Sequence, residues 1–261
     1  MGCKEKAGGY CIRFPVTPEA EGSSPFDPAS KSQGVSQKVN SFFFSNVITQ
    51  TKAGKGETME KRSWEQNAQF ISNTLRLRTL PIGVAFLKDP SEFPEKTRRP
   101  SKVFGKKITI CQGITLARVY GWTTGLTADD LNCVPALLAF GLTSAPDPVD
   151  ALSGLICDIN FAKNKEAALV EIESIHRFQN GEYKAILMAP LQKGLFEPDT
   201  VVIYGNPAQI MRIIQSMVFE NAGRIPGNFG GKDECTEYLI APFKNGAPRI
   251  AIPGNGDRIF S

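Results

Sequence analysis

Hydrophobic and polar residues recur with a recognisable period only from about residue 64 onward. In residues 64–77 the apolar positions return at helical spacing, and Ser63 followed by Gln66 has the form of an N-terminal capping box. Residues 82–87 are instead a short, continuous apolar run bounded by prolines, which is typical of a buried strand. The sequence therefore predicts a helix followed by a strand at the start of the regular part of the chain.

The middle of the chain predicts two helices with a cysteine near the start of each. Residues 111–120 have apolar positions at helical spacing and stop at a glycine, so Cys111 falls near the beginning of that helix. Thr127 and Asp130 form a second capping pattern, which predicts a helix with Cys133 in its early turns.

The remaining elements favour an α+β fold, because strands and helices do not alternate regularly along the chain. We expect a single domain with a mixed sheet packed by several helices. Residues 94–107 are basic and interrupted by proline and glycine, so a loop is expected there. The later elements are predicted as a helix at 146–157, strands at 183–190 and 200–204, a helix at 207–217 that begins after Asn206 and buries Ile210, Ile213, Ile214 and Met217, and a last strand at 249–253.

The first 58 residues differ from the rest of the chain. They are rich in glycine, serine and proline and show no sustained period of strand or helix. They also lack the ordered positive, apolar and small-residue regions of a secretory signal. Residues 55–57, Lys-Gly-Glu, can be encoded by a purine-rich run of the ribosome-binding type, and they stand just before Met59. We therefore expect residues 1–58 to be a non-native or disordered leader, Met59 to be the true start, and residues 59–261 to form one globular domain.

Composition and charge exclude several classes of protein. The chain has 261 residues, and 30 Lys and Arg against 26 Asp and Glu give a formal net charge of +4. The basic residues are spread along the chain, which argues against nucleic acid as the main partner. No apolar run approaches the roughly 18 residues of a membrane-spanning helix. Together with the missing secretory signal, this predicts a cytoplasmic protein with no nucleic-acid or membrane partner.

Four cysteines of the predicted domain are its strongest chemical signal. They are Cys111, Cys133, Cys157 and Cys235, and none of them belongs to a CxxC pair. Cys111 and Cys133 are predicted near helix starts, where backbone N–H groups stabilise a thiolate, and Cys235 follows a glycine-rich turn. Four thiolates are the ligand set of a structural zinc ion or an iron–sulfur cluster. The sequence thus predicts a metal- or iron–sulfur-binding protein with a redox or cofactor-handling role, whose ligands come from separate segments.

Other interpretations of these cysteines stay open. Free cysteine is often a buried small hydrophobe, and a redox or disulfide pair is a further alternative, although a reducing cytosol disfavours structural disulfides. If the cysteines are inert, the chain is instead a small-molecule or anion-binding module. Its candidate binding residues are then Asn206 at a helix start, Gly230 and Gly231 in the glycine-rich turn, and Arg258. A structural or regulatory partner protein is the third class, and the sequence indicates no reaction, substrate or oligomeric state.

Several separated motifs of this chain resemble those of one prokaryotic family. In chain order they are residues 111–118 (CQGITLAR), 132–135 (NCVP), 139–142 (AFGL), 196–199 (FEPD), 206–209 (NPAQ), 230–235 (GGKDEC) and 253–258 (PGNGDR). From about residue 64 to 261 the chain is thereby similar to the uncharacterised family called domain of unknown function 169, or ArCR. The resemblance implies no activity, so the predicted sites rest on the residues themselves.

Overall fold

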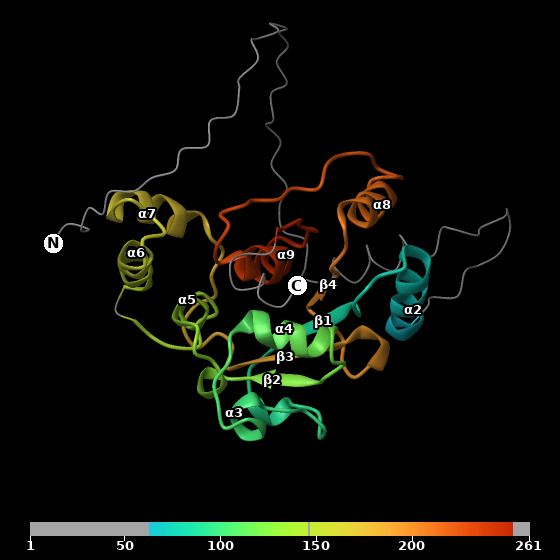
Figure 1. The fold of residues 1–261 in the computed structure, drawn as a ribbon, viewed down its shortest axis with the longest axis horizontal. Coiled ribbons are helices and arrows are strands. Elements are labelled where there is room, and N and C mark those ends of the chain that lie inside the picture. Colours follow the sequence, from blue (N-terminus) through green and yellow to red (C-terminus); the bar gives the residue numbers. More distant parts are fainter. Residues whose placement is uncertain (1–62, 146, 253–261) are drawn as a thin grey trace, which may run out of the picture.

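A computed structural model describes residues 63–145 and 147–252 of the chain (Figure 1). The predictions about the leader, residues 1–58, and about Arg258 therefore concern residues outside the described part. The described residues form the α+β arrangement that the sequence predicts, with one sheet and helices packed around it.

The sheet has four strands in the order β2-β3-β1-β4. The strands are β1 (Ile82–Leu87), β2 (Thr124–Leu126), β3 (Ala185–Pro190) and β4 (Thr200–Val202). All three ladders are antiparallel, and Val84 is paired with Met188 on one side and with Thr200 on the other. Parallel pairing among the described residues occurs in two isolated bridges, Arg98 with Thr124 and Ile108 with Leu131. β1 is central and lies between two partners, which explains why its sequence is a continuous apolar run.

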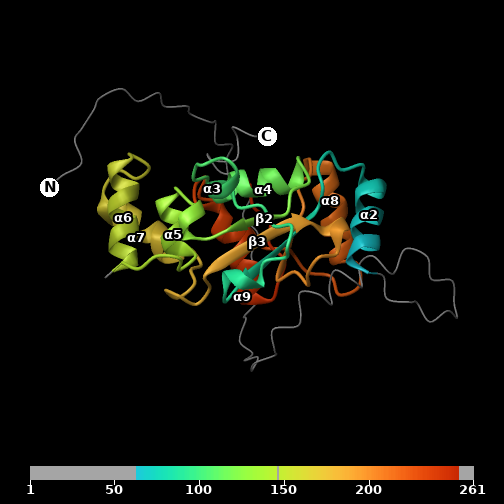
Figure 2. The same ribbon diagram turned by 90° about the horizontal axis from the view of Figure 1, so that it is seen from below.

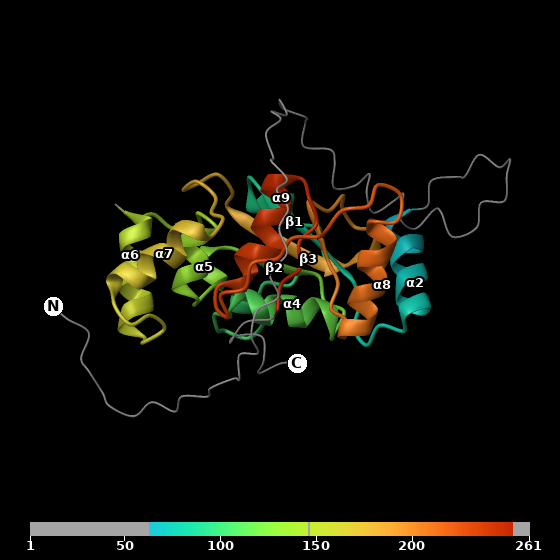
Figure 3. The same cartoon turned by 90° about the horizontal axis from the view of Figure 1, so that it is seen from above.

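The long helices lie on one face and at both ends of the sheet. α4 (Ile110–Arg118) runs along one face of β2 and β3 (Figure 2). α2 (Trp64–Leu75) and α8 (Pro207–Met217) lie side by side at one end of the molecule, and α6 (Pro148–Asp158) and α7 (Lys165–Ser174) form a pair at the opposite end (Figure 3). The short elements are η2 (Pro90–Glu92), α3 (Pro100–Val103), η3 (Ala128–Asp130), α5 (Val134–Ala139), η4 (Leu191–Lys193), the π-helical η5 (Thr236–Ile240) and α9 (Ala241–Asn245).

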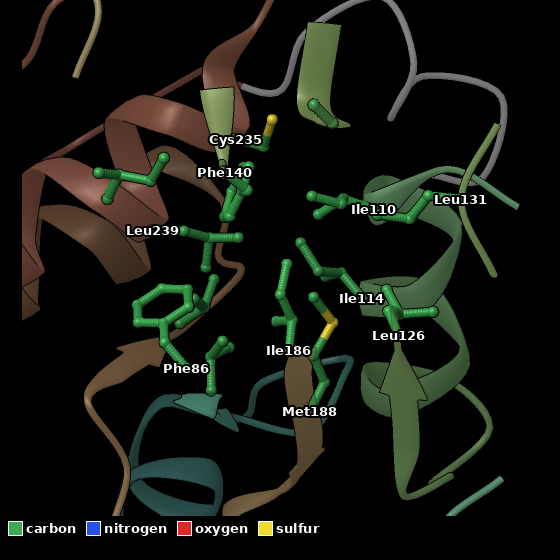
Figure 4. Close-up of a cluster of buried hydrophobic side chains, with 14 of the residues drawn as sticks. Phe86, Ile110, Ile114, Leu126, Leu131, Phe140, Ile186, Met188, Cys235 and Leu239 are labelled. Atoms are coloured by element: carbon green, nitrogen blue, oxygen red, sulfur yellow. The ribbon is translucent and has the colours of Figure 1, made fainter. Parts of the chain in front are cut away.

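The main hydrophobic core fills the space between the sheet, α4, α5 and η5. Figure 4 shows Ile186 and Met188 of β3 between Ile114 of α4 and Leu239 of η5, with Phe86 of β1 beside them. A second, smaller core joins α6 to α7 and contains Leu152, Ile156, Ala168 and Ile172. The α6–α7 pair therefore packs mainly on itself, and Leu138 of α5 also belongs to this second core.

Local signals placed several elements correctly. Ser63 and Gln66 form the predicted capping box of α2, with each side chain bonded to the other residue's backbone. β1 and α8 have the predicted bounds, and α4 and α6 differ from theirs by one or two residues. These elements depend on caps and periodicity that neighbouring residues supply, which is why the sequence alone indicates them.

The predicted helix that begins at Thr127 is divided in two, so this prediction was wrong in its first half. Thr127 caps only the short η3, after which Leu131 is extended with φ −107° and ψ 136°. α5 starts after Cys133, which is its N-cap residue and does not lie within a helix. Pro135 explains the division, because proline has no N–H to continue a preceding helix and favours the first turn of a new one.

The strand predicted over residues 249–253 is also wrong for the part that the structure describes. Residues 249–252 are irregular, and the Ile250 amide donates to the carbonyl oxygen of Pro226 at 3.0 Å. The loop expected at 94–107 contains one short helix, α3. α7 was not predicted, since its apolar residues do not gather on one face and its sequence therefore lacks the usual helical signal.

Candidate functional site

A cavity of about 200 Å³ lies between β4, α8 and residues 248–251. We call it the α8 cavity. Apolar side chains make up most of its wall, and Tyr238 of η5 and Pro242 of α9 complete the lining. An apolar cavity with a few polar groups is the usual form of a small-molecule site in a protein.

α8 contributes its whole apolar face to this cavity. Ile210, Ile213, Ile214 and Met217 repeat at helical spacing and all line the α8 cavity. The sequence predicted that this face is buried, yet none of the residues of α8 is buried in the described structure. The prediction of the helix was right. The prediction that it is buried was wrong, because its apolar face lies against a cavity and not against a packed core.

The N-terminal end of α8 is held in place by hydrogen bonds to α2. Asn206 caps α8 by accepting a hydrogen bond from the Gln209 amide at 3.0 Å, and the Gln209 side chain accepts from the Asn206 amide in return. The Nε2 atom of Gln209 also donates to the carbonyl oxygens of Leu75 at 2.8 Å and Arg76 at 3.1 Å. α8 is thus anchored at its start, independently of how its apolar face packs.

One cationic side chain lines the α8 cavity, and a second contacts a residue of its wall. Arg118, in the last turn of α4, places its guanidinium carbon 4.2 Å from the ring centre of Tyr204, which lines the cavity. Arg249 lines the cavity directly, and its Nη1 lies 3.4 Å from Oε1 of Glu237. The side chains of Arg249 and Glu237 are 15% and 9% exposed. These charges are therefore held near the cavity with little access to water.

The residues predicted to bind a cofactor have different surroundings. Asn206 is the capping residue of α8, and its neighbour Gly205 lines the α8 cavity. The amides of Gly230 and Gly231 both donate to Oε1 of Glu234, at 2.8 and 2.6 Å. The glycine-rich turn thus has the amide geometry that holds an anion, and the anion it holds is a carboxylate of the protein itself. Because Arg258 lies beyond the described residues, the structure does not place it with the others.

A group of carboxylates surrounds this turn. Burial is the main cause that raises the pKa of Glu234, although the Gly231 and Gly230 amides lower it. Burial, followed by the nearby charge of Glu171, raises the pKa of Asp233 to about 6. Glu171 is itself paired with Lys232 at 2.7 Å. Asp233 therefore changes its protonation state close to neutral pH.

Three of the four predicted thiolate ligands belong to segments around the main core. The parallel bridge between Ile108 and Leu131 aligns the segments that lead into α4 and α5, and Cys111 and Cys133 follow it in those two segments. Cys235, directly before η5, lies in the core together with Ile110 and Leu131 (Figure 4).

The pKa of the Cys133 thiol is shifted in the direction opposite to that expected at a helix start. Burial raises the pKa of the Cys133 thiol, and the nearby charge of Asp233 acts in the same direction, whereas a hydrogen bond from the Ala136 amide lowers it. Burial therefore outweighs the helix start at this position. The fourth predicted ligand, Cys157, is 8% exposed in the last turn of α6. Among residues 63–145 and 147–252 no group of three or more His, Cys, Asp and Glu side chains is placed to hold a metal ion. The four-cysteine site stays a prediction.

Comparison with known proteins places the chain in a family. Residues 71–261 match the family described as uncharacterised ArCR, domain of unknown function 169, and the chain belongs to this family. An uncharacterised protein of Methanocaldococcus jannaschii is 24% identical over 204 residues, which cover 78% of this chain and 85% of that protein. No solved structure matches the chain.

Within the described part of the chain, no helix is both long enough and apolar enough to cross a bilayer.

Proposed function

We propose that this protein binds a small, largely apolar molecule in the α8 cavity. The observation that carries the proposal is the state of α8, whose apolar face lines a cavity of about 200 Å³ while none of its residues is buried. An amphipathic helix normally gains its stability by packing that face against a core. A bound apolar molecule would supply the contacts that the core does not supply here.

The size of the cavity sets the size of the ligand. An engineered apolar cavity of about 150 Å³ accepts benzene. The α8 cavity, at about 200 Å³, is somewhat larger and suits a single ring with a short substituent, or a branched chain of similar volume. Such a ligand removes apolar surface of α8 from water, and each Å² of buried apolar surface contributes roughly 25 cal/mol of favourable free energy. Binding would therefore stabilise the folded protein by an amount that increases with the logarithm of ligand concentration once this concentration exceeds the dissociation constant.

The fixed start of α8 supports this proposal further. Because Gln209 bonds to the backbone of Leu75 and Arg76, the helix is held without its apolar face being packed. A binding site that is largely formed before the ligand arrives costs less to order on binding. We also keep the expectation that the protein acts in the cytoplasm and that nucleic acid and membrane are not its partners.

The predicted metal site is a separate candidate with a different test. Its support is the placement of Cys111, Cys133 and Cys235 on segments that meet at the main core. The α8 cavity takes precedence because it is already formed by described residues, whereas no metal-holding group is assembled among them. Iron, sulfide and zinc contents of protein purified without oxygen test the metal prediction. A stoichiometric metal that is lost on Cys→Ser substitution would support it.

The cavity proposal is tested by ligand-induced stabilisation with α-methylstyrene as the probe. We expect this apolar ring compound to raise the Tm of the full chain in a concentration-dependent way. Ile213→Phe places a larger side chain in the cavity wall and should abolish the shift, whereas Gln215→Phe, on the exposed side of the same helix, should leave it intact. The absence of a shift in the unmodified protein, or an equal shift in the Ile213→Phe variant, would overturn the proposal.

A further inference from the structure

We propose that the surface around α3 binds an acidic segment of another protein. Carboxylates of that segment pair with the cations of this surface, and one of its apolar side chains covers Phe104. We call it the α3 surface, and it consists of Arg98, Lys102, Val103, Phe104, Trp122 and Lys193. α3 lies away from α8 in two perpendicular views (Figures 1 and 2). The proposal is therefore independent of the α8 cavity and does not rest on the proposed function.

Positive charge is concentrated in the segment that contains α3. Residues 95–107 hold six Lys and Arg against one Glu, whereas the whole chain has a net charge of only +4. One of the six, Arg99, is paired with Asp130. Arg98 and Lys102 are exposed, and neither forms an ion pair within the described part of the chain. Their charges are therefore available to an external anion.

A third cation of the α3 surface comes from a distant segment. Lys193, the last residue of η4, donates from Nζ to Oγ1 of Thr123 at 3.2 Å. The Arg98 amide donates to the carbonyl oxygen of the same threonine at 2.8 Å, so Thr123 brings the two cations to one place. Burial lowers the pKa of Lys193, and the charge of Arg98 lowers it further. A carboxylate that binds both side chains relieves the repulsion between them.

The apolar part of the α3 surface is built on Trp122. The ring of Phe104 is stacked on the Trp122 ring, with the centroids 5.4 Å apart and the planes at 18°. The guanidinium carbon of Arg98 lies 4.4 Å from the centre of the Trp122 ring. Phe104 is nevertheless 47% exposed, and its neighbour Val103 is 50% exposed. Because aromatic residues and arginine are enriched in protein interfaces, this combination is typical of a surface that binds another protein.

An acidic protein segment fits the α3 surface better than a nucleic acid does. Single-stranded nucleic acid binds by stacking its bases on open aromatic rings. The Trp122 ring already contacts Phe104 and Arg98, so it is not an open plane for a base. The exposed apolar groups, Phe104 and the aliphatic Val103, suit a leucine or phenylalanine side chain of a peptide. Carboxylates beside that side chain would accept hydrogen bonds from the guanidinium of Arg98.

The test measures how a fluorescein-labelled peptide, Glu-Asp-Phe-Glu-Asp-Leu-Glu-Glu, binds the full chain by fluorescence anisotropy at about 0.1 M salt. Two control peptides carry the same label. In the amide peptide every Glu and Asp is replaced by Gln and Asn, and in the serine peptide Phe and Leu are replaced by Ser.

Three protein variants are compared with the unmodified chain. Lys102→Glu and Phe104→Ser change the α3 surface. Lys163→Glu makes the same charge change at an exposed position between α6 and α7. All three side chains are exposed, so each substitution should change the Tm by less than about 4 °C.

We expect the acidic peptide to bind the unmodified protein about tenfold more tightly than the amide peptide, because neutral side chains form no ion pairs. Lys102→Glu should weaken binding of the acidic peptide about tenfold, and Lys163→Glu should change it by less than about twofold. Phe104→Ser should weaken it about fivefold. The serine peptide should bind the unmodified protein and Phe104→Ser equally well, because the apolar contact is absent from both complexes.

Three results would overturn the proposal. The first is that the acidic peptide shows no saturable binding. The second is an equal loss of binding in Lys102→Glu and Lys163→Glu, which would show a response to net charge alone. The third is tighter binding of an eight-nucleotide oligouridylate, or of vesicles containing phosphatidylserine, than of the acidic peptide. That result would assign the surface to nucleic acid or to a membrane.

Discussion

Arg99 holds Asp130 through two guanidinium nitrogens, with Nε at 3.0 Å and Nη2 at 2.7 Å from the same carboxylate oxygen. Asp130 is completely buried, and its carboxylate also accepts hydrogen bonds from Ser101 and Thr127. Burial raises the pKa of Asp130, but the hydrogen bonds outweigh burial and hold this pKa below its ordinary value. Asp130 was expected to belong to the cap of a helix that continues through Cys133. Its side chain instead connects the start of α3 to η3.

Asp130→Asn should destabilise the fold by about 3 kcal/mol at neutral pH, because an NH2 donor replaces one of the two oxygens that accept hydrogen bonds from buried groups, and because Arg99 loses its counter-charge. The folded-state pKa is depressed, so the stability from the ionised group is present above the unfolded pKa of about 3.9 and is lost as pH falls through the folded pKa. The difference between the two proteins should therefore shrink in acid. Urea unfolding at neutral and acidic pH measures both effects. Asp129→Asn is the matched exposed control and should change stability by less than about 0.5 kcal/mol; equal effects of the two variants would contradict the structural role of Asp130.

Asp233 should give the opposite dependence on pH. Its pKa is raised to about 6, first by burial and then by Glu171, so the folded protein binds its proton more tightly than the unfolded chain does. Stability is then lost as pH rises from about 4 to about 6. Asp233→Asn removes this loss and keeps the left-handed backbone at φ 55°, which asparagine tolerates. We expect the variant to exceed the unmodified protein by about 2 kcal/mol at pH 8, after allowance for partial exposure, and to lose this advantage near pH 4. A constant difference across this range would show that ionisation of Asp233 is not its cause.

The glycine-rich turn gives a test of the anion-binding prediction. Glu234→Ala leaves the amides of Gly230 and Gly231 without their acceptor and should cost about 2 kcal/mol, whereas Glu234→Gln keeps an acceptor oxygen and should cost clearly less. Sulfate stabilises proteins in general, and Asp129→Asn serves as the control for this effect. Because the Glu234 carboxylate already accepts from these amides, we expect sulfate to give additional stabilisation to the alanine variant and none to the unmodified protein. Thermal unfolding with and without sulfate measures this difference. If sulfate stabilises the unmodified protein beyond the control, external anions displace the Glu234 carboxylate from the turn, and the prediction is wrong.

Two helical glycines should respond in opposite directions to the same substitution. Gly154, in α6, has open space around the position of a Cβ atom, so Gly154→Ala should stabilise the protein by about 0.5–1 kcal/mol. Gly113, in α4, would place a Cβ atom 2.9 Å from Cδ1 of Leu126, and Gly113→Ala should destabilise it by about 1–3 kcal/mol. Chemical denaturation of both variants measures the sign. Stabilisation by Gly113→Ala would mean that Leu126 moves without cost and that the contact between α4 and β2 is loosely packed.

The elements that the sequence predicts well are those stabilised by near neighbours. The box of Ser63 and Gln66 starts α2, Pro207 starts α8, and the apolar run of β1 requires a buried central strand. The sequence did not predict that the helix expected after Thr127 is divided. Its capping pattern is present, but it caps only the short η3, whose buried Asp130 is bonded to Arg99. That ion pair joins residues far apart in the sequence, and no local pattern contains it.

The candidate site depends even more on distant contacts. The sequence drew attention to Asn206 and to the glycine-rich turn, and these proved to lie beside the α8 cavity and against Glu234, respectively. Arg249 was not singled out, because its position in an expected strand gave no reason to connect it with α8. Its pairing with Glu237 in η5 was the missing signal, and only the folded chain brings these residues together.

By itself the sequence determined the α+β class, the positions of α2, α4, α6, α8 and the central strand, and the amphipathic nature of α8. These properties depend on hydrogen bonds and side-chain spacing within a few turns of chain, so they are encoded locally. Only the tertiary structure decided what the apolar face of α8 lies against, that Glu234 occupies the glycine-rich turn, and that burial raises the pKa values of Cys133 and Asp233. Each of these depends on which distant segments meet, because burial and charge are properties of the surroundings that the fold creates.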